Sequence, residues 1–128
     1  MMKNDGVCPC GFDATYAEHC ELIHENGAGL GVTAEALMRA RYTAYVRHDR
    51  AFLMASWHPD TCPASLEFDS GIEWLGLEII DTQAGGAFDS RGEVEFRARF
   101  ARGDEHLELH ERSSFERVDG RWVYIDGT

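Results

Sequence analysis

The chain has 128 residues, of which 44% are hydrophobic and 11% aromatic. This length and this apolar content favour one hydrophobic core and exclude an intrinsically disordered chain. The net charge of −11, from 23 acidic and 12 basic residues, disfavours binding to nucleic acid or to anionic lipid, because both attract clusters of Lys and Arg.

The sequence also bears on the compartment and on membranes. No apolar run approaches the roughly 18 residues that a membrane-spanning helix needs, so we expect no membrane association. Residues 1–6 lack the hydrophobic segment of a signal peptide. We therefore expect a cytoplasmic protein whose four cysteines are thiols or metal ligands rather than disulfides.

The first feature along the chain is a cluster of potential metal ligands. Cys8, Cys10 and Cys20 lie close together in the sequence, and either His19 or His24 can supply a fourth ligand. Thiolate and imidazole groups in a tetrahedral shell are the ligands that Zn²⁺ prefers. Because a Cys₃His shell occupies all four positions, the cluster predicts a structural zinc site, not a catalytic one.

A glycine-rich stretch, residues 26–31, divides the chain into two predicted units. The first, residues 1–26, is a zinc knuckle, and the second, residues 32–128, is a compact domain. Apolar residues spaced three and four apart predict a helix that begins after a cap at Thr33 and ends near His48.

A second helix is predicted directly after the first. Asp49 is its expected cap, and apolar residues continue to Trp57. The helix should stop at His58, because the residue before a proline, here Pro59, is disfavoured in helical geometry.

From Trp74 onward the apolar residues recur with a period of two, which is typical of strands. In the first strand, Leu75, Leu77 and Ile79 are expected on the face opposite Trp74. Further strands are predicted over residues 93–100, 107–115 and 122–125, the last two joined by a tight turn at residues 119–120. Two helices followed by an antiparallel meander indicate an α+β fold.

The spacing of the N-terminal ligands resembles the SEC-C zinc motif, named for the C-terminus of the translocase ATPase SecA. In that motif the last two ligands are adjacent, which favours His19 over His24. Because the ligand set is closed, we expect the knuckle to present a rigid surface, with side chains such as Phe12 and Tyr16, to a protein partner. The implied ligands of one Zn²⁺ ion are Cys8, Cys10, His19 and Cys20.

Motifs along the second unit carry another resemblance: Leu37-Met38-Arg39 with Arg41-Tyr42, Ser56-Trp57-His58-Pro59, Glu73-Trp74-Leu75-Gly76-Leu77, and residues 94–100, 111–115 and 120–127. They resemble the YchJ-like family of uncharacterised bacterial proteins. This implies a cone similar to nuclear transport factor 2 (NTF2), in which helices pack in the concavity of a curved antiparallel sheet. It implies no activity, because the function of the family is unassigned.

The interior of such a cone is a second candidate site, with the possible pocket residues Trp57, His58, Glu73, Trp74, His110 and Glu111. His110 with Glu108 or Glu111 would suit proton transfer. However, alternation places His106, Glu108, His110 and Arg112 on one strand face, which equally fits a solvated outer face, and the tryptophans equally fit an ordinary core.

Two arginines and one cysteine lie outside these predicted sites. Arg39 and Arg41 lie two apart on the first helix and point in different directions, so we expect one of them to pair with a strand carboxylate. Cys62 is expected to be a small, partly buried residue.

Two hypotheses for function follow. The first is a zinc-binding accessory or interaction protein that acts through the knuckle. The alternative is a small-molecule binder or a proton-transfer enzyme that uses a pocket in the cone.

Overall fold

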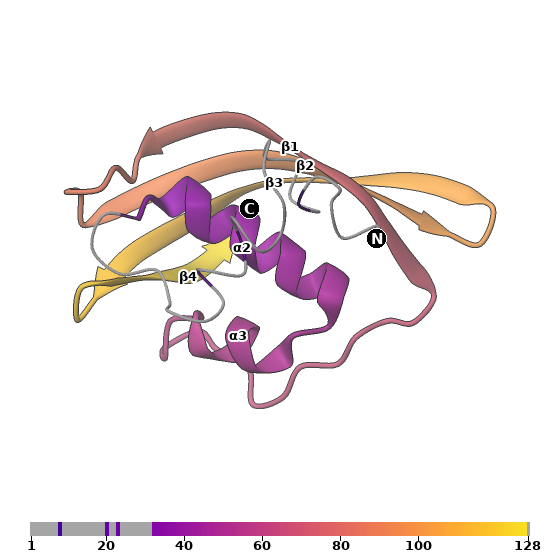
Figure 1. The fold of residues 1–128 in the computed structure, drawn as a ribbon, viewed down its shortest axis with the longest axis horizontal. Coiled ribbons are helices and arrows are strands. Elements are labelled where there is room, and N and C mark those ends of the chain that lie inside the picture. Colours follow the sequence, from indigo (N-terminus) through magenta and orange to yellow (C-terminus); the bar gives the residue numbers. More distant parts are fainter. Residues whose placement is uncertain (1–7, 9–19, 21–22, 24–31, 128) are drawn as a thin grey trace.

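A computed structural model describes Cys8, Cys20, Ile23 and residues 32–127 of the chain. Within residues 32–127, two helices, α2 and α3, precede four strands, β1 to β4, which confirms the predicted α+β order. The strands form one curved antiparallel sheet, and α2 lies across its concave side with α3 beyond it (Figure 1). The rest of the predicted knuckle lies outside the described residues.

Helix α2, Ala34–Arg47, has the caps that the sequence predicts. The Thr33 hydroxyl accepts a hydrogen bond from the backbone N–H of Ala36 at 3.1 Å, which satisfies one of the free donors of the first turn. The helix ends at His48, whose left-handed backbone, with φ of 57°, turns the chain towards α3.

Helix α3, Arg50–Ala55, begins as predicted but is shorter. The Asp49 carboxylate accepts from the backbone N–H of Phe52 at 3.1 Å and caps its first turn. The predicted extension to Trp57 is wrong, because Trp57 forms an isolated parallel bridge with Tyr124 of the last strand. That pairing with a residue distant in the sequence replaces the final helical turn.

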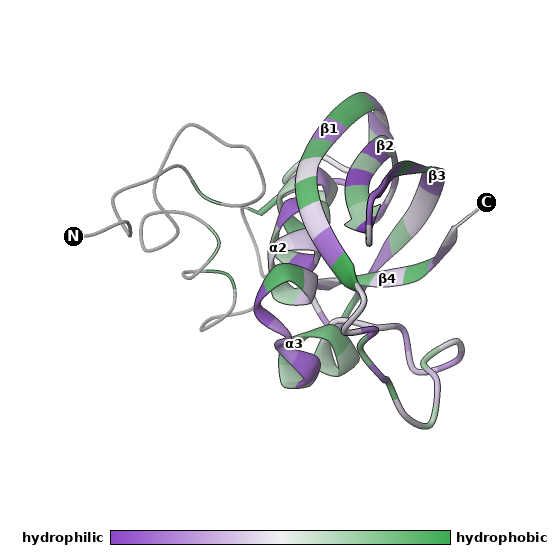
Figure 2. Ribbon diagram, turned by 90° about the vertical axis from the view of Figure 1, so that its right-hand side faces the viewer, coloured by the Kyte–Doolittle hydropathy of each residue, from purple (hydrophilic) through white to green (hydrophobic). Residues whose placement is uncertain are grey.

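The sheet is a simple meander in the order β1-β2-β3-β4, with bounds Ile72–Ala84, Arg91–Arg102, Glu105–Val118 and Arg121–Gly127. The predicted turn between β3 and β4 is confirmed. Asp119 and Gly120 have φ values of 54° and 83°, as a two-residue hairpin turn requires. Apolar and polar residues alternate along the strands (Figure 2).

A bulge corrects the predicted faces of β1. The pairing with β2 shifts register between Trp74 and Gly76, so an extra residue enters β1 there. Trp74 consequently packs against the core together with Leu77 and Ile79, whereas Leu75 is 47% exposed. The prediction that Leu75 shares a face with Leu77 is wrong for this reason.

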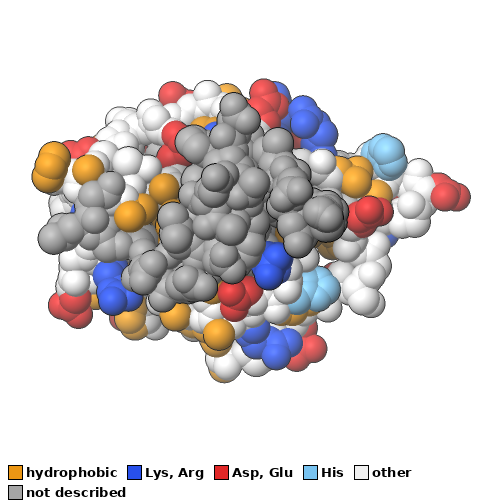
Figure 3. Space-filling view, in the orientation of Figure 1, with side chains coloured by type: hydrophobic (Ala, Val, Ile, Leu, Met, Phe, Trp, Pro, Cys, Tyr) orange, Lys and Arg blue, Asp and Glu red, His pale blue; other side chains and the backbone are white. Residues whose placement is uncertain are grey.

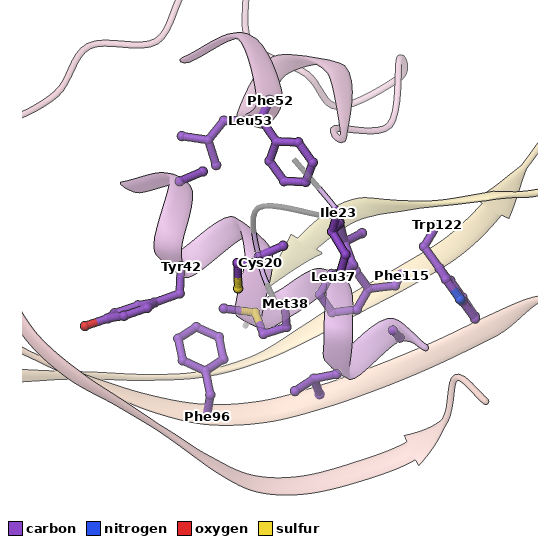
Figure 4. Close-up of a cluster of buried hydrophobic side chains, with 14 of the residues drawn as sticks. Cys20, Ile23, Leu37, Met38, Tyr42, Phe52, Leu53, Phe96, Phe115 and Trp122 are labelled. Atoms are coloured by element: carbon purple, nitrogen blue, oxygen red, sulfur yellow. The ribbon is translucent and has the colours of Figure 1, made fainter. Parts of the chain in front are cut away.

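The core lies between α2 and the concave face of the sheet. Leu37 of α2 is fully buried against this core, and Phe115 and Trp122 enter it from β3 and β4. Cys20 and Ile23 lie among the same buried side chains (Figure 4). The described part of the N-terminal segment therefore shares one hydrophobic core with the cone. Among the described residues, no helix is long and apolar enough to cross a membrane.

Candidate functional site

A cavity of about 270 Å³ opens between α2 and the concave face of the sheet. Its volume is close to the lower end of the range of small-molecule sites. Three polar side chains, Arg41, Glu111 and Ser113, lie in an otherwise apolar or aromatic wall. The remaining lining residues are Met38, Tyr42, Tyr45, Trp57, Trp74, Phe96, Ala98, Leu109 and Tyr124.

The periods of the elements explain why these side chains meet. On α2, Met38, Arg41 and Tyr45 recur at spacings of three and four residues and so share one face. On β3, Leu109 and Glu111 are two apart and point to the same side of the sheet. The cavity is therefore built from one helical face and the inner face of the sheet.

Arg41 is the most unusual residue in this wall, because it is a charged side chain with only 3% of its surface exposed. Its Nη1 donates to the backbone oxygen of Leu53 at 2.9 Å and to Ser56 Oγ at 2.7 Å. The guanidinium carbon lies 4.8 Å from the ring centre of Trp57 and 4.6 Å from that of Tyr124. These contacts hold the cation at a fixed position beside the cavity.

Arg41 has no carboxylate within ion-pair distance among the described residues. Burial lowers the pKa of its guanidinium to about 10. The expected ion pair of Arg39 or Arg41 with a strand carboxylate is absent from the described residues, since Arg39 Nε instead pairs with Glu35 Oε2 of the same helix at 2.9 Å. Arg41 is thus a buried cation whose charge is offset mainly by aromatic faces and neutral oxygens.

Glu111 brings an opposite charge to the same cavity. Its side chain is partly exposed, and none of the described residues forms a hydrogen bond or an ion pair with its carboxylate. It lies close enough to Tyr124 to raise the pKa of that phenol, an effect second to burial. Gly127 leaves room for the carboxylate, because a Cβ at that position would overlap Glu111 Oε1.

The structure separates the predicted pocket residues into two groups. Trp57, Trp74 and Glu111 line the cavity. His110 lies on the outer face of the sheet, where its Nε2 and Glu95 Oε2 are 2.6 Å apart, and Glu73 is exposed. The pair His110 and Glu111 does not meet, because neighbours in a strand point to opposite faces.

His58 is held at the rim of the fold instead of in the cavity. Its Nδ1 lies 3.9 Å from Asp60 Oδ2, and its Nε2 lies 3.6 Å from Glu116 Oε2. Its backbone N–H donates to the oxygen of Tyr124 at 2.7 Å. This hydrogen bond attaches the segment after α3 to β4, the last strand of the sheet.

The outer face of the sheet carries a network of opposite charges, as expected of a strand face in contact with solvent. Arg112 Nε lies 2.6 Å from Glu93 Oε1, and its Nη1 lies 3.2 Å from Asp81 Oδ2. Arg97 Nε lies 2.8 Å from Glu108 Oε2. Acidic and basic side chains are likewise interspersed on the face that Figure 3 draws.

Two of the predicted zinc ligands meet at helix α2. Cys8 Sγ lies 3.8 Å from Thr43 Oγ1, and the same hydroxyl donates to Cys20 Sγ at 3.4 Å. Both cysteines are buried. Cys10, His19 and His24 lie outside the described residues, and the described part of the chain contains no group of three potential metal ligands. The two thiol groups that can be described fit the donor set of zinc.

Cys62 is partly buried as predicted. Several cavity residues were not predicted as pocket residues, and the most important of them is Arg41. A signal was present: Arg41 follows Leu37 by four residues and Met38 by three, so it falls on the apolar stripe of the helix. A charged residue on a buried stripe deserves to be treated as a candidate ligand-binding residue.

A curved antiparallel sheet that holds a helix and a cavity in its concavity defines an NTF2-like domain. Residues 33–127 match the profile of the family described as "YchJ, middle NTF2-like domain". The chain belongs to this YchJ-like family, as its sequence motifs had indicated.

Relatives with similar sequences support the same assignment. A UPF0225 protein of Streptomyces coelicolor is 52% identical over 120 residues, which cover 94% of this chain and 93% of that protein. A UPF0225 protein of Corynebacterium glutamicum is 43% identical and covers 94% of each chain.

Similar folds have been solved as well. The solution structure of a SEC-C motif containing protein from Rhodopseudomonas palustris has a TM-score of 0.80 and 32% identity, covering 94% of this chain and 96% of that one. The crystal structure of a SEC-C motif containing protein from Psychrobacter arcticus has a TM-score of 0.77 and 25% identity, covering 98% of this chain and 84% of that one.

Proposed function

We propose that the protein binds a small organic anion in the cavity of its cone, with Arg41 as the anchoring cation. The observation that carries this proposal is the burial of Arg41 beside an apolar cavity without a carboxylate partner among the described residues. A buried charge is costly unless an opposite charge accompanies it. A ligand carboxylate next to the side of the guanidinium that faces the cavity would provide the negative charge.

The lining favours binding over the alternative of proton-transfer catalysis. Glu111 is the one carboxylate among the described lining residues, and those residues include no histidine. The titratable group near Glu111 is the Tyr124 phenol, and burial raises its pKa away from the near-neutral value that suits general acid–base catalysis. The aromatic wall instead suits a flat or apolar ligand body.

The test compares an acid with a neutral molecule of the same shape. We expect 3-phenylpropionate to raise the melting temperature, because a ligand that binds only the folded state stabilises it. We expect 3-phenylpropanamide to have little effect. Arg41→Met should abolish the shift, and Arg99→Met should retain it, because Arg99 is 53% exposed and pairs with Glu78 on the outer face. Equal shifts with the acid and the amide would refute the anion-binding role.

The cysteines favour a second function. We propose that the N-terminal segment holds one structural Zn²⁺ ion through Cys8, Cys10, His19 and Cys20, and that the resulting knuckle binds a protein partner. The support is the approach of two buried thiol groups to one hydroxyl of α2, together with the likeness to SEC-C motif containing proteins. Such a site needs reduced thiols, which the cytoplasm, our proposed location, maintains.

Native mass spectrometry of the reduced protein tests the zinc proposal. We expect one Zn²⁺ ion per chain, and we expect His19→Ala to weaken its retention while His24→Ala does not. Absence of zinc from the reduced wild-type protein after incubation with excess metal would refute the site. Loss of zinc in the His24 variant alone would assign the fourth ligand to His24.

A further inference from the structure

The cavity contains two opposite charges that do not neutralise each other. Arg41 enters from helix α2 and Glu111 from strand β3, and the two side chains form no ion pair. Glu111 is partly exposed at the cavity wall, so its carboxylate is accessible to a cationic group of a ligand. A ligand with a single negative charge would satisfy Arg41 and leave Glu111 facing a second anion.

The immediate surroundings locate the Glu111 carboxylate beside β4. Gly127 of β4 leaves the space that the carboxylate fills, and a side chain there would displace it. Ser113, only 1% exposed, lies on the same strand face and lines the same cavity. The raised pKa of the Tyr124 phenol has Glu111 as one of its causes, which places the charge near the ring that also covers Arg41.

We infer that the ligand is a zwitterion, an amino acid with an aromatic or large apolar side chain, whose carboxylate pairs with Arg41 and whose ammonium group pairs with Glu111. The apolar body lies against Tyr42, Trp74 and Phe96. The inference rests on the proposed function of the cavity and adds the second charge and its position. Opposite charges at two points of the ligand would also fix its orientation.

Isothermal titration calorimetry with three matched compounds tests this inference: L-phenylalanine carries both charges, 3-phenylpropionate only the carboxylate, and 2-phenylethylamine only the ammonium group. We expect L-phenylalanine to bind the wild-type protein at least about tenfold more tightly than either of the others, since a charge-assisted hydrogen bond contributes on that order.

The decisive variant is Glu111→Gln, which keeps the shape of the side chain and removes its charge. We expect it to weaken L-phenylalanine binding about tenfold or more and to strengthen 3-phenylpropionate binding, because the repulsion between two carboxylates is removed. Glu108→Gln is the matched control, the same change on the outer face of the same strand, and should alter neither affinity. The tryptophan fluorescence of each variant verifies that it is folded.

The outcomes separate the inference from the function on which it rests. One outcome is that the wild-type protein binds 3-phenylpropionate as tightly as L-phenylalanine and that Glu111→Gln changes neither affinity. In that case the zwitterion inference is overturned and the anion-binding function stands. If none of the three compounds binds at millimolar concentration, both are overturned.

Discussion

Tyr124 connects the cavity to the edge of the sheet. Its ring covers the Arg41 guanidinium at 4.6 Å and meets Trp57 edge to face at 5.2 Å. Its backbone N–H donates to the backbone oxygen of Ser56 at 2.8 Å, and its backbone oxygen accepts from the backbone N–H of His58 at 2.7 Å. One residue therefore holds the chain after α3 against β4 and forms part of the cavity wall.

The environment of Tyr124 predicts a pH effect on stability. Burial, and then the charge of Glu111, raise the pKa of its phenol above the ordinary value of 10.0. Above pH 10 the unfolded chain loses this proton first, so the free energy of unfolding should fall as the pH rises through the pKa of the folded state. Urea unfolding at pH 9 and pH 11 measures how far the free energy of unfolding falls between these two pH values. This decrease should be smaller for Tyr124→Phe than for the wild type, and an equal decrease would contradict the prediction.

At the scale of elements, the start of α2 is fastened to the end of β1. Gly85 N–H donates to the backbone oxygen of Arg91 at 2.9 Å, and the oxygen of Gly85 accepts from Ala34 at the same distance. A Cβ on Gly92 would lie 2.7 Å from Gly85 N. This close approach of two backbones positions the helix that carries Arg41.

Gly92→Ala should therefore lower the free energy of unfolding by about 3 kcal/mol, since the two backbones must separate to admit the methyl group. Gly76→Ala is the matched control, because a Cβ there meets nothing within 4 Å. We expect it to change stability by less than about 1 kcal/mol. Urea unfolding measures the free energy of unfolding of both variants. Equal decreases would show that the close contact between Gly92 and Gly85 does not determine the effect of the substitution.

Much of this architecture follows from local sequence patterns. Apolar spacing and the caps Thr33 and Asp49 predict where both helices begin, because capping depends on residues within one turn. The bulge at Gly76 breaks the strand period by one residue, and alternation alone does not reveal it. The early end of α3 depends on Tyr124, a partner far along the chain.

The candidate site shows the same division between local and distant information. The residue types and the cone implied by the family resemblance predict Trp57, Trp74 and Glu111 as possible pocket residues, and all three line the cavity. Alternation alone left the side of His110 open, since it does not say which strand face covers the helix. The lack of a carboxylate partner for Arg41 among the described residues emerges only when three separate segments are brought together.

At the scale of the whole molecule, Cys8, Cys20 and the cone share one core. Cys8 and Cys20 pack in the same buried cluster as Leu37 of α2. Arg41 and Thr43 are close neighbours on that helix, so one element carries both the cavity cation and the hydroxyl near the two thiols. A substitution of Cys8 or Cys20 should therefore change the stability of the cone.

Cys20→Ser should lower the melting temperature of the cone itself, because it places a hydroxyl in a fully buried site. All three tryptophans of the chain lie after residue 31, so their fluorescence reports only the cone. Cys62→Ser, the same change at a partly buried position, should have a clearly smaller effect. Equal melting temperatures for wild type and Cys20→Ser would show that the N-terminal segment does not contribute to the stability of the cone.

The bulges in β1 have a consequence for how copies of the protein behave together. β1 lies at the edge of the sheet, and an edge strand offers its backbone groups to any other extended chain. Its pairing shifts register twice, once at Trp74 and again after Ile79. An incoming strand would find the row of donors and acceptors interrupted at both points, so the irregular edge protects the protein against intermolecular β-pairing and aggregation.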